Sequence, residues 1–210
     1  MKNIRCMPSY LSGEMEAKSQ NISYLYLLCA GALSEKGVCI KSYKPDDKAQ
    51  FILKLLRTMG AKVVIDKEGV SVKKGILFGT MANLTKLEEF FPLVCVMAGL
   101  SDKMFTQITG VRSLRTGSSD KVVIVSENLS KIGIALSEDD DDEVLVWADN
   151  EITGGSVDAH NDPHFAMALM IASCACNIAL DIYEIEGLKS AYSDFIDEFN
   201  ALGGKASYLD

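Results

Sequence analysis

Residues 165–180 read FAMALMIASCACNIAL, and this run decides what kind of fold the chain can adopt. It is apolar on nearly every side of a helix. Two further runs share this character, ISYLYLLCAGAL at residues 22–33 and FFPLVCVMAGL at residues 90–100. A helix that is apolar all round must be enclosed by protein. The sequence therefore predicts three helices packed on one another in the interior.

The apolar runs recur with a period of about one third of the chain, which is 210 residues long. Ala30, Ala98 and Ala172 occupy similar points in them, at steps of 98 − 30 = 68 and 172 − 98 = 74 residues. Self-similarity at a fixed period indicates a repeated supersecondary unit. The expected repeats cover about residues 12–80, 81–150 and 151–210, within a single domain of residues 1–210.

Each repeat has the same expected order of elements: apolar helix, strand, amphipathic helix, strands. The short strands are expected at residues 38–41, 104–108 and 180–185. The amphipathic helices are expected at residues 46–59, 118–132 and 191–202. Each ends at a glycine, which takes the left-handed conformation at no steric cost: Gly60, Gly133 and Gly203. Hairpins follow the first two, at residues 62–72 and 134–147.

This pattern predicts an α/β fold with the apolar helices inside and short-stranded sheets outside. The alternative is a doubly wound parallel sheet, in which the strands would be the most apolar elements. Coordinates that show a central parallel sheet flanked by the three apolar helices would favour that alternative.

Composition excludes several classes of protein. With 21 basic and 29 acidic residues, the formal charge is 21 − 29 = −8, which argues against a general nucleic-acid or membrane-surface binder. The first 20 residues contain no apolar core typical of a signal peptide, and the 16-residue apolar run is shorter than the ~20 residues a bilayer needs. Six cysteines lack the paired spacing of zinc ligands. We expect free thiols and a cytoplasmic protein.

The segment DAHNDPH at residues 158–164 holds both histidines of the chain. In an extended strand Asp158, His160, Asp162 and His164 would share one face, where they could hold a divalent metal. Alternatively, Asp162 caps a helix that begins at Pro163. A degenerate anion-binding loop is a third interpretation.

Two further segments combine cations with expected helix starts. Residues 112–121 read RSLRTGSSDK, and residues 187–195 place Lys189 before a helix. Free N–H groups and the helix dipole favour an anion at such a start. The alternative in each case is a capped surface helix with solvated charges. If the repeats pack around a pseudo-threefold axis, these helix N-termini could gather on one face as a composite anion site.

Two acidic segments are interpreted more simply. The run at residues 138–142 is expected to be a solvated hairpin tip. Glu88 and Glu89 precede an apolar helix, where they favour its N-terminus electrostatically; a catalytic carboxylate is the alternative.

Five motifs resemble the C-terminal half of the 5-enolpyruvylshikimate-3-phosphate (EPSP) synthase family, the 3-phosphoshikimate 1-carboxyvinyltransferases. The resemblance covers about residues 15–204. The matching stretches are SY through MGAKV at residues 23–63, EFFP at 89–92, GVRSLR and SDK at 110–121, NDPHFAMA at 161–168, and SAYSDF at 190–195.

The resemblance implies an inverse α/β domain of three βαβαββ units, one of two such domains joined by a hinge, with the site between them. The family transfers the enolpyruvyl group of phosphoenolpyruvate to the 5-hydroxyl of shikimate 3-phosphate and releases phosphate. It needs no metal or other cofactor, and the implied ligands are small phosphorylated molecules rather than nucleic acid or membrane.

The resemblance also assigns site residues. Glu89 stands for the family's aspartate base, and the expected anion contacts are Arg115, Lys121, His164 and Lys189, with Asp120 and Asp162 retained. Several positions depart from the family pattern. A Lys–Glu pair becomes Gly117-Ser118, two arginines become Lys121 and His164, and a lysine becomes Ser190.

These departures from the family pattern are expected to cost much of the free energy of ligand binding and transition-state stabilisation. A charge-assisted contact contributes about 1.5–3 kcal/mol, so the altered contacts could together remove on the order of 5 kcal/mol, or over three decades in rate. We therefore expect a family domain that is inactive alone and requires a partner chain supplying the N-terminal half. The alternative is a non-enzymatic binding or assembly module with the same fold.

Overall fold

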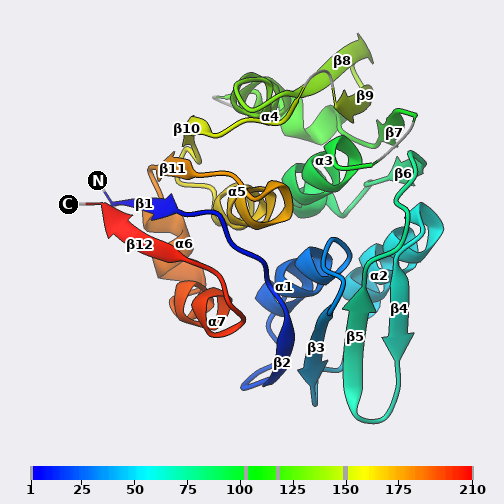
Figure 1. Ribbon diagram of the computed structural model, residues 1–210. Helices are drawn as coiled ribbons and strands as arrows, with labels where there is room; N and C mark the ends of the chain where they lie inside the picture. Colours follow the sequence, from blue (N-terminus) through cyan, green and yellow to red (C-terminus); the bar gives the residue numbers. More distant parts are fainter. Residues whose placement is uncertain (1, 102–103, 117–118, 149–150, 210) are drawn as a thin grey trace.

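The computed structural model describes residues 2–101, 104–116, 119–148 and 151–209. Within these residues, twelve strands form three four-stranded sheets, which surround a group of helices (Figure 1). The first sheet has the order β2-β3-β5-β4, the second β6-β7-β9-β8 and the third β10-β11-β1-β12. The bounds of the first sheet's strands are β2 Gly13–Glu16, β3 Val38–Lys41, β4 Lys62–Ile65 and β5 Gly69–Lys73. Those of the second are β6 Met81–Asn83, β7 Thr106–Thr109, β8 Ile134–Asp140 and β9 Glu143–Ala148.

The third sheet joins both ends of the chain. Its strands are β10 Gly155–Asp158, β11 Leu180–Tyr183, β1 Asn3–Cys6 and β12 Ala206–Leu209. In every sheet the first pair is parallel and the next two pairs are antiparallel. Strand β1 therefore takes the place that β5 and β9 hold in the other sheets. The N-terminal strand completes the last repeat, which the sequence pattern did not predict.

Three helices occupy the centre, as the apolar runs predicted. They are α1 Ser23–Gly31, α3 Phe91–Gly99 and α5 Pro163–Cys176. Every residue of α1 and α3 is buried, and so are residues 165–174 of α5. Helix α5 packs against both α1 and α3, and Figure 1 shows the three at the middle of the molecule with the sheets at its periphery. This arrangement confirms the inverse α/β fold and rules out a central doubly wound sheet.

Small residues let the central helices approach the sheets. At Gly31, a Cβ atom would lie 2.5 Å from the carbonyl oxygen of Val72 on β5. At Gly99, it would lie 2.6 Å from the side chain of Ile134. The recurring Ala-Gly pairs thus mark the points where an apolar helix crosses its sheet.

The remaining helices lie outside this centre. They are α2 Asp47–Met59, α4 Lys121–Ser130, α6 Glu186–Ala191 and α7 Phe195–Ala201, with 3₁₀ turns η1 Glu88–Phe90 and η2 Arg112–Arg115. The predicted glycines all have positive φ, namely 112° at Gly60, 94° at Gly133 and 99° at Gly203. Among the helices in the described ranges, none has the length and apolar character needed to cross a bilayer.

Two predicted bounds are wrong. The helix expected at residues 191–202 is the shorter α7, Phe195–Ala201, and a separate helix, α6, ends at Ala191 where the expected helix would begin. The third apolar helix ends at Cys176, because Asn177 adopts a left-handed conformation with φ 55°. The apolar residues that follow belong to the approach to β11 rather than to the helix.

Candidate functional site

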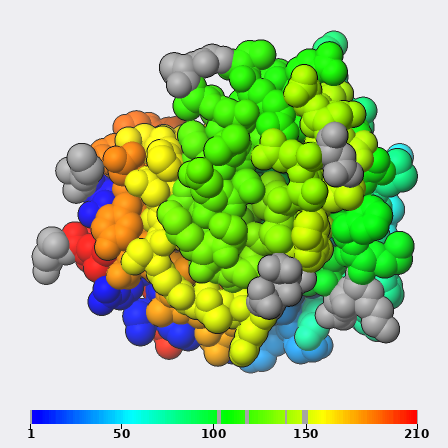
Figure 2. Space-filling view, turned by 90° about the horizontal axis from the view of Figure 1, so that it is seen from above, coloured from blue at the N-terminus to red at the C-terminus, as the bar shows by residue number. Residues whose placement is uncertain are grey.

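A cavity of about 370 Å³ lies where the N-terminal ends of α3, α4 and α5 meet. Four of the predicted site residues line it together: Glu89, Lys121, Asp162 and His164. Glu89 and Lys121 come from the second repeat and Asp162 and His164 from the third, so helix N-termini of two repeats gather at this cavity. Seen from above in Figure 2, the α4 segment (green) adjoins the segment around residues 155–162 (yellow), in agreement with the contacts between α4 and β10.

Glu89 lies in η1, directly before α3. Lys48, in the first turn of α2, places Nζ 2.5 Å from Oε1 of Glu89. The side chain of Glu89 is 25 % exposed. The neighbouring Glu88 accepts a hydrogen bond from Ser113 Oγ at 3.0 Å. A hydrogen bond from its own backbone N–H, with help from Ser113, holds the pKa of Glu88 below its usual value. Both carboxylates at this helix start are therefore held by side chains of the same chain, Glu89 by Lys48 and Glu88 by Ser113.

Asp162 caps α5, as predicted. Its Oδ1 accepts hydrogen bonds from the backbone N–H groups of His164 at 2.9 Å and Phe165 at 3.3 Å. Its Oδ2 accepts one from Lys121 Nζ at 2.9 Å. A carboxylate at this position satisfies orphan N–H groups and complements the helix dipole. The charge of Lys121, which faces the cavity, is thus paired within the chain.

Helix α4 is capped by Asp120 rather than by a serine. Oδ1 of Asp120 accepts hydrogen bonds from the N–H groups of Val122 at 2.9 Å and Val123 at 3.2 Å. The helix expected from residue 118 therefore begins three residues later, at Lys121, with this aspartate as its cap. Residues 117–118 lie outside the described residues.

His164 is half-buried in the lining of the site rather than exposed on the surface. The Tyr26 hydroxyl of α1 lies 2.9 Å from His164 Nδ1 and 3.5 Å from the carbonyl oxygen of Glu89. Burial lowers the pKa of His164, against the opposing influence of the Asp162 and Glu89 carboxylates. The imidazole is therefore neutral at pH 7 and serves as a hydrogen-bonding group. It supplies no positive charge for an anion.

Arg115 lies beside the site but does not line the cavity. Its Nη1 donates to Glu138 at 2.6 Å and to Asp120 at 3.3 Å, and its Nε donates to the carbonyl oxygen of Asp141 at 3.0 Å. The side chain is 14 % exposed, and Nη2 is buried without a partner among the described residues. Its guanidinium ties η2 to the β8–β9 hairpin. The expected solvated hairpin tip is thus partly held by this arginine.

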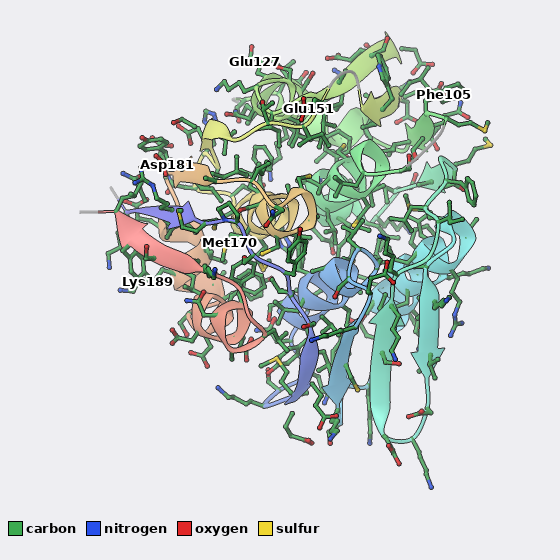
Figure 3. All side chains as sticks on the ribbon, in the orientation of Figure 1. Phe105, Glu127, Glu151, Met170, Asp181 and Lys189 are labelled. Atoms are coloured by element: carbon green, nitrogen blue, oxygen red, sulfur yellow. The ribbon has the colours of Figure 1, made fainter. Side chains whose placement is uncertain are left out.

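Lys189 is not part of the cavity. It lies within α6 rather than before a helix, and its charge lowers the pKa of Lys2 near the N-terminus. Figure 3 shows Lys189 on the side of the molecule where the two chain ends meet, away from α3 and α4. Lys189 therefore does not join the predicted anion contacts Lys121 and His164 at this cavity.

The extended face predicted for residues 158–164 is also wrong. His160 and Asn161 have φ 49° and 57°, so the chain turns sharply after Asp158. Asp162 and His164 face Lys121 and Tyr26, as described above. Asp158 and His160 instead lie beside Glu184. The four alternating side chains therefore divide into two groups.

The charge around the cavity is predominantly negative. Its lining includes Glu88, Glu89, Asp162 and Glu184 against the single lysine Lys121. The helix N-termini that could attract an anion already carry their own carboxylates. Asp46 caps α2 at 2.8 Å from the N–H of Ala49, as Asp120 and Asp162 do for α4 and α5. The helix N-termini thus lie together, as a composite anion site requires. The chain's own carboxylates, however, offset the positive charge of these helix ends.

Sequence reasoning did not assign a role to three residues of this region: Tyr26, Lys48 and Glu184. Lys48 had a signal, since it falls at the start of the first expected amphipathic helix. Tyr26 had none beyond its place in an apolar run. Glu184 follows β11, and only the pairing of β11 with β10 brings it to the site.

Comparison with known proteins agrees with these features. The family model of EPSP synthase (3-phosphoshikimate 1-carboxyvinyltransferase) matches residues 7–199. A 3-phosphoshikimate 1-carboxyvinyltransferase of Clostridium perfringens is 30 % identical over 184 residues, covering 85 % of this chain and 42 % of the relative. One from Halobacterium salinarum is 29 % identical, with 85 % of this chain and 43 % of the relative covered.

Solved structures show the same fold. EPSP synthase from Acinetobacter baumannii has a TM-score of 0.76 at 18 % identity, covering 90 % of this chain and 46 % of that one. The enolpyruvyl transferase NikO from Streptomyces tendae has a TM-score of 0.71 at 18 % identity, covering 90 % and 44 %. The chain thus spans less than half the length of these relatives. It belongs to the EPSP synthase (3-phosphoshikimate 1-carboxyvinyltransferase) family.

Proposed function

We propose that this chain supplies one half of a carboxyvinyltransferase site and is inactive without a partner chain that supplies the N-terminal half. The observation that carries the proposal is the convergence of Glu89, Lys121, Asp162 and His164 on one cavity. These residues match family motifs from two repeats, and only folding brings Glu89, Lys121 and the Asp162–His164 segment together. Phosphoenolpyruvate and shikimate 3-phosphate are the proposed ligands of the assembled site.

The roles follow from chemistry and position. Glu89 is the proton-transfer carboxylate, since it is an acceptor at the cavity with partial exposure and a lysine beside it. Lys121 is the anion contact, released from Asp162 when a phosphate or carboxylate ligand takes over. His164 is a neutral hydrogen-bonding group that orients the ligand. Arg115 and Lys189 do not line the cavity, so they take no direct part.

The requirement for a partner follows from the charge balance. Within this half, Lys48 is paired with Glu89 and Lys121 with Asp162. A dianionic phosphate would have to displace those carboxylates in a cavity whose lining is net negative. In the family the site lies between two halves, so the second half has to contribute the missing positive charge and cover the open side.

Phosphate release tests this proposal. The isolated chain, the N-terminal half of a family member, and the mixture are each supplied with phosphoenolpyruvate and shikimate 3-phosphate. We expect release from the mixture alone. Glu89→Gln and Lys121→Met should abolish or strongly reduce it, while Lys189→Met, a matched loss of a remote lysine, should leave it unchanged. Turnover by the isolated chain would contradict the requirement for two chains.

A second candidate is a non-enzymatic binding or assembly module with the same fold. It is favoured by the ion pairs of Lys121 with Asp162 and of Lys48 with Glu89, and by the engagement of Arg115 with Glu138 and Asp120. Calorimetry separates the two candidates. Binding of shikimate 3-phosphate and phosphoenolpyruvate to the mixed halves supports the first. Absence of binding to the chain, the partner half and the mixture supports the second.

A further inference from the structure

Three potential metal ligands converge at the edge of the third sheet. One ligand atom from each of Asp158, His160 and Glu184 lies within 4.8 Å of the other two. The parallel register pairs Asp158 with Tyr183, so β10 and β11 end at the same level. The backbone N–H of Asn161 then donates to the carbonyl oxygen of Glu184 at 2.8 Å. This bond holds the turn that carries His160 beside Glu184.

The negative charge of this cluster is not compensated by the chain. Among the described residues, neither Asp158 nor Glu184 forms an ion pair, whereas the nearby Asp162 and Glu89 each hold a lysine. Asp158 Oδ1 accepts a hydrogen bond from the backbone N–H of His160 at 2.7 Å, and Glu184 Oε2 lies 3.5 Å from the side-chain amide of Asn161. Two carboxylates this close repel each other unless a cation lies between them.

The donor set selects a kind of cation. Two carboxylate oxygens alone would suit Mg²⁺ or Ca²⁺, while an imidazole nitrogen shifts the preference toward Mn²⁺, Fe²⁺ or Zn²⁺. His160 is exposed, and both carboxylates are half-buried. Three protein ligands on one side leave further coordination positions open to water. His160 and Glu184 also line the cavity, so those positions face it.

We infer that Asp158, His160 and Glu184 form a binding site for a divalent transition-metal ion at the rim of the cavity. The site keeps Asp158 and His160 of the tetrad suggested by the sequence and replaces Asp162 and His164 with Glu184. A cation held there adds positive charge to a rim that is otherwise mostly acidic. The inference does not rest on the proposed transferase function, since it concerns the binding of the metal alone.

Titration of the full chain with Mn²⁺ alone tests the inference. We expect one equivalent to bind saturably, and His160→Ala and Glu184→Gln each to weaken the affinity about tenfold or more, the scale at which metal sites respond to lost support. Asp140→Asn, in the exposed acidic hairpin, is the matched control for non-specific binding and should leave the affinity unchanged. Equal binding by the unsubstituted chain and both ligand variants would overturn the inference, and so would loss of binding in Asp140→Asn alone.

A spectroscopic readout identifies the nitrogen ligand independently of affinity. The chain contains two histidines, so an imidazole nitrogen hyperfine coupling to bound Mn²⁺ can come only from His160 or His164. The coupling should vanish in His160→Ala and persist in His164→Gln, with thermal unfolding used to verify that both variants are folded. Persistence in His160→Ala would overturn the assignment, as would absence of the coupling in the unsubstituted chain.

Discussion

The interior formed by α1, α3 and α5 and the cavity rim at the N-terminal ends of α3, α4 and α5 differ in how their side chains are held. In the interior, apolar side chains pack against many neighbours, and no single pair is decisive. At the rim, individual charges are held by particular partners, as Lys48 is by Glu89 and Lys121 by Asp162. Two regions built by some of the same helices thus depend on different physical interactions.

This difference explains how the fold can persist while the chemistry changes. An interior tolerates many apolar sequences if volume and pattern are kept. The relative from Acinetobacter baumannii shares the fold with a TM-score of 0.76 at only 18 % identity. The cavity rim tolerates far fewer substitutions, because the replacement of one cation changes the local charge balance. Each of the following predictions separates the two regions by experiment.

Truncation of an interior ring should have the largest effect. Phe165, at the start of α5, is 1 % exposed. Phe165→Ala should lower the free energy of unfolding by about 3–5 kcal/mol, because it removes buried area and leaves a cavity. Urea unfolding measures the loss, and Phe165→Leu serves as a control with a smaller loss. A cost below about 1 kcal/mol for the alanine variant would mean that the interior is not closed at this point.

Loss of the Asp162 cap should have the next largest effect. Asp162→Ala removes two backbone hydrogen bonds to α5 and the contact with Lys121, and should cost about 1–2 kcal/mol. Asp162→Asn keeps a capping oxygen and loses only the charge, so it should cost less. Thermal unfolding of both variants tells capping from ion pairing. Equal losses in the two variants would show that the charge, not the cap, stabilises this end of the helix.

Lowering the pH should reduce the stability of the protein through His164, which lies at the cavity rim. Burial holds its pKa below the ordinary value of 6.5, so below that pH the unfolded chain binds a proton that the folded chain excludes. Stability should therefore be fully present above about pH 6.5 and fall as the pH drops below it. Urea unfolding at pH 7, 6 and 5 measures this slope.

Replacement of each histidine in turn identifies the source of the slope. His164→Gln should flatten the part between pH 6.5 and 5, although Tyr26 then loses its present partner and the variant is less stable at every pH. His160→Gln, which removes the other, exposed histidine, should keep the slope. A slope that survives in His164→Gln would assign the acid sensitivity to other groups.

The smallest expected effect is that of a partly exposed ion pair. Lys48→Met removes the partner of Glu89 and should change the free energy of unfolding by less than about 1 kcal/mol, with the difference reduced by salt. Lys41→Met is the matched control, since Lys41 pairs with Glu14 at 2.7 Å on the first sheet, remote from the cavity. A loss of more than about 2 kcal/mol from Lys48→Met alone would show that the rim shares the energetics of the interior.

Much of the candidate site could be predicted from the sequence, for reasons that differ by residue. Asp162 follows a local rule, since an aspartate before proline and an apolar run predicts a cap. Glu89 and Lys121 rested on motif resemblance, and the structure brings them to the same cavity. Lys189 rested on the same kind of resemblance, but the direction of a short helix turned it away.

The sequence by itself determined which segments lie inside and where most of the helices stop. Those properties depend on neighbours within a few residues, so periodicity and glycine positions are sufficient. Only the tertiary structure decided that β1 completes the third sheet, where Asn3 pairs with Leu209, 209 − 3 = 206 residues away. It also decided that Glu184 lies beside His160 and that His164 contacts the Tyr26 hydroxyl. Such pairings form between distant segments because they complete sheets and fill the interior, and no local pattern specifies the partner.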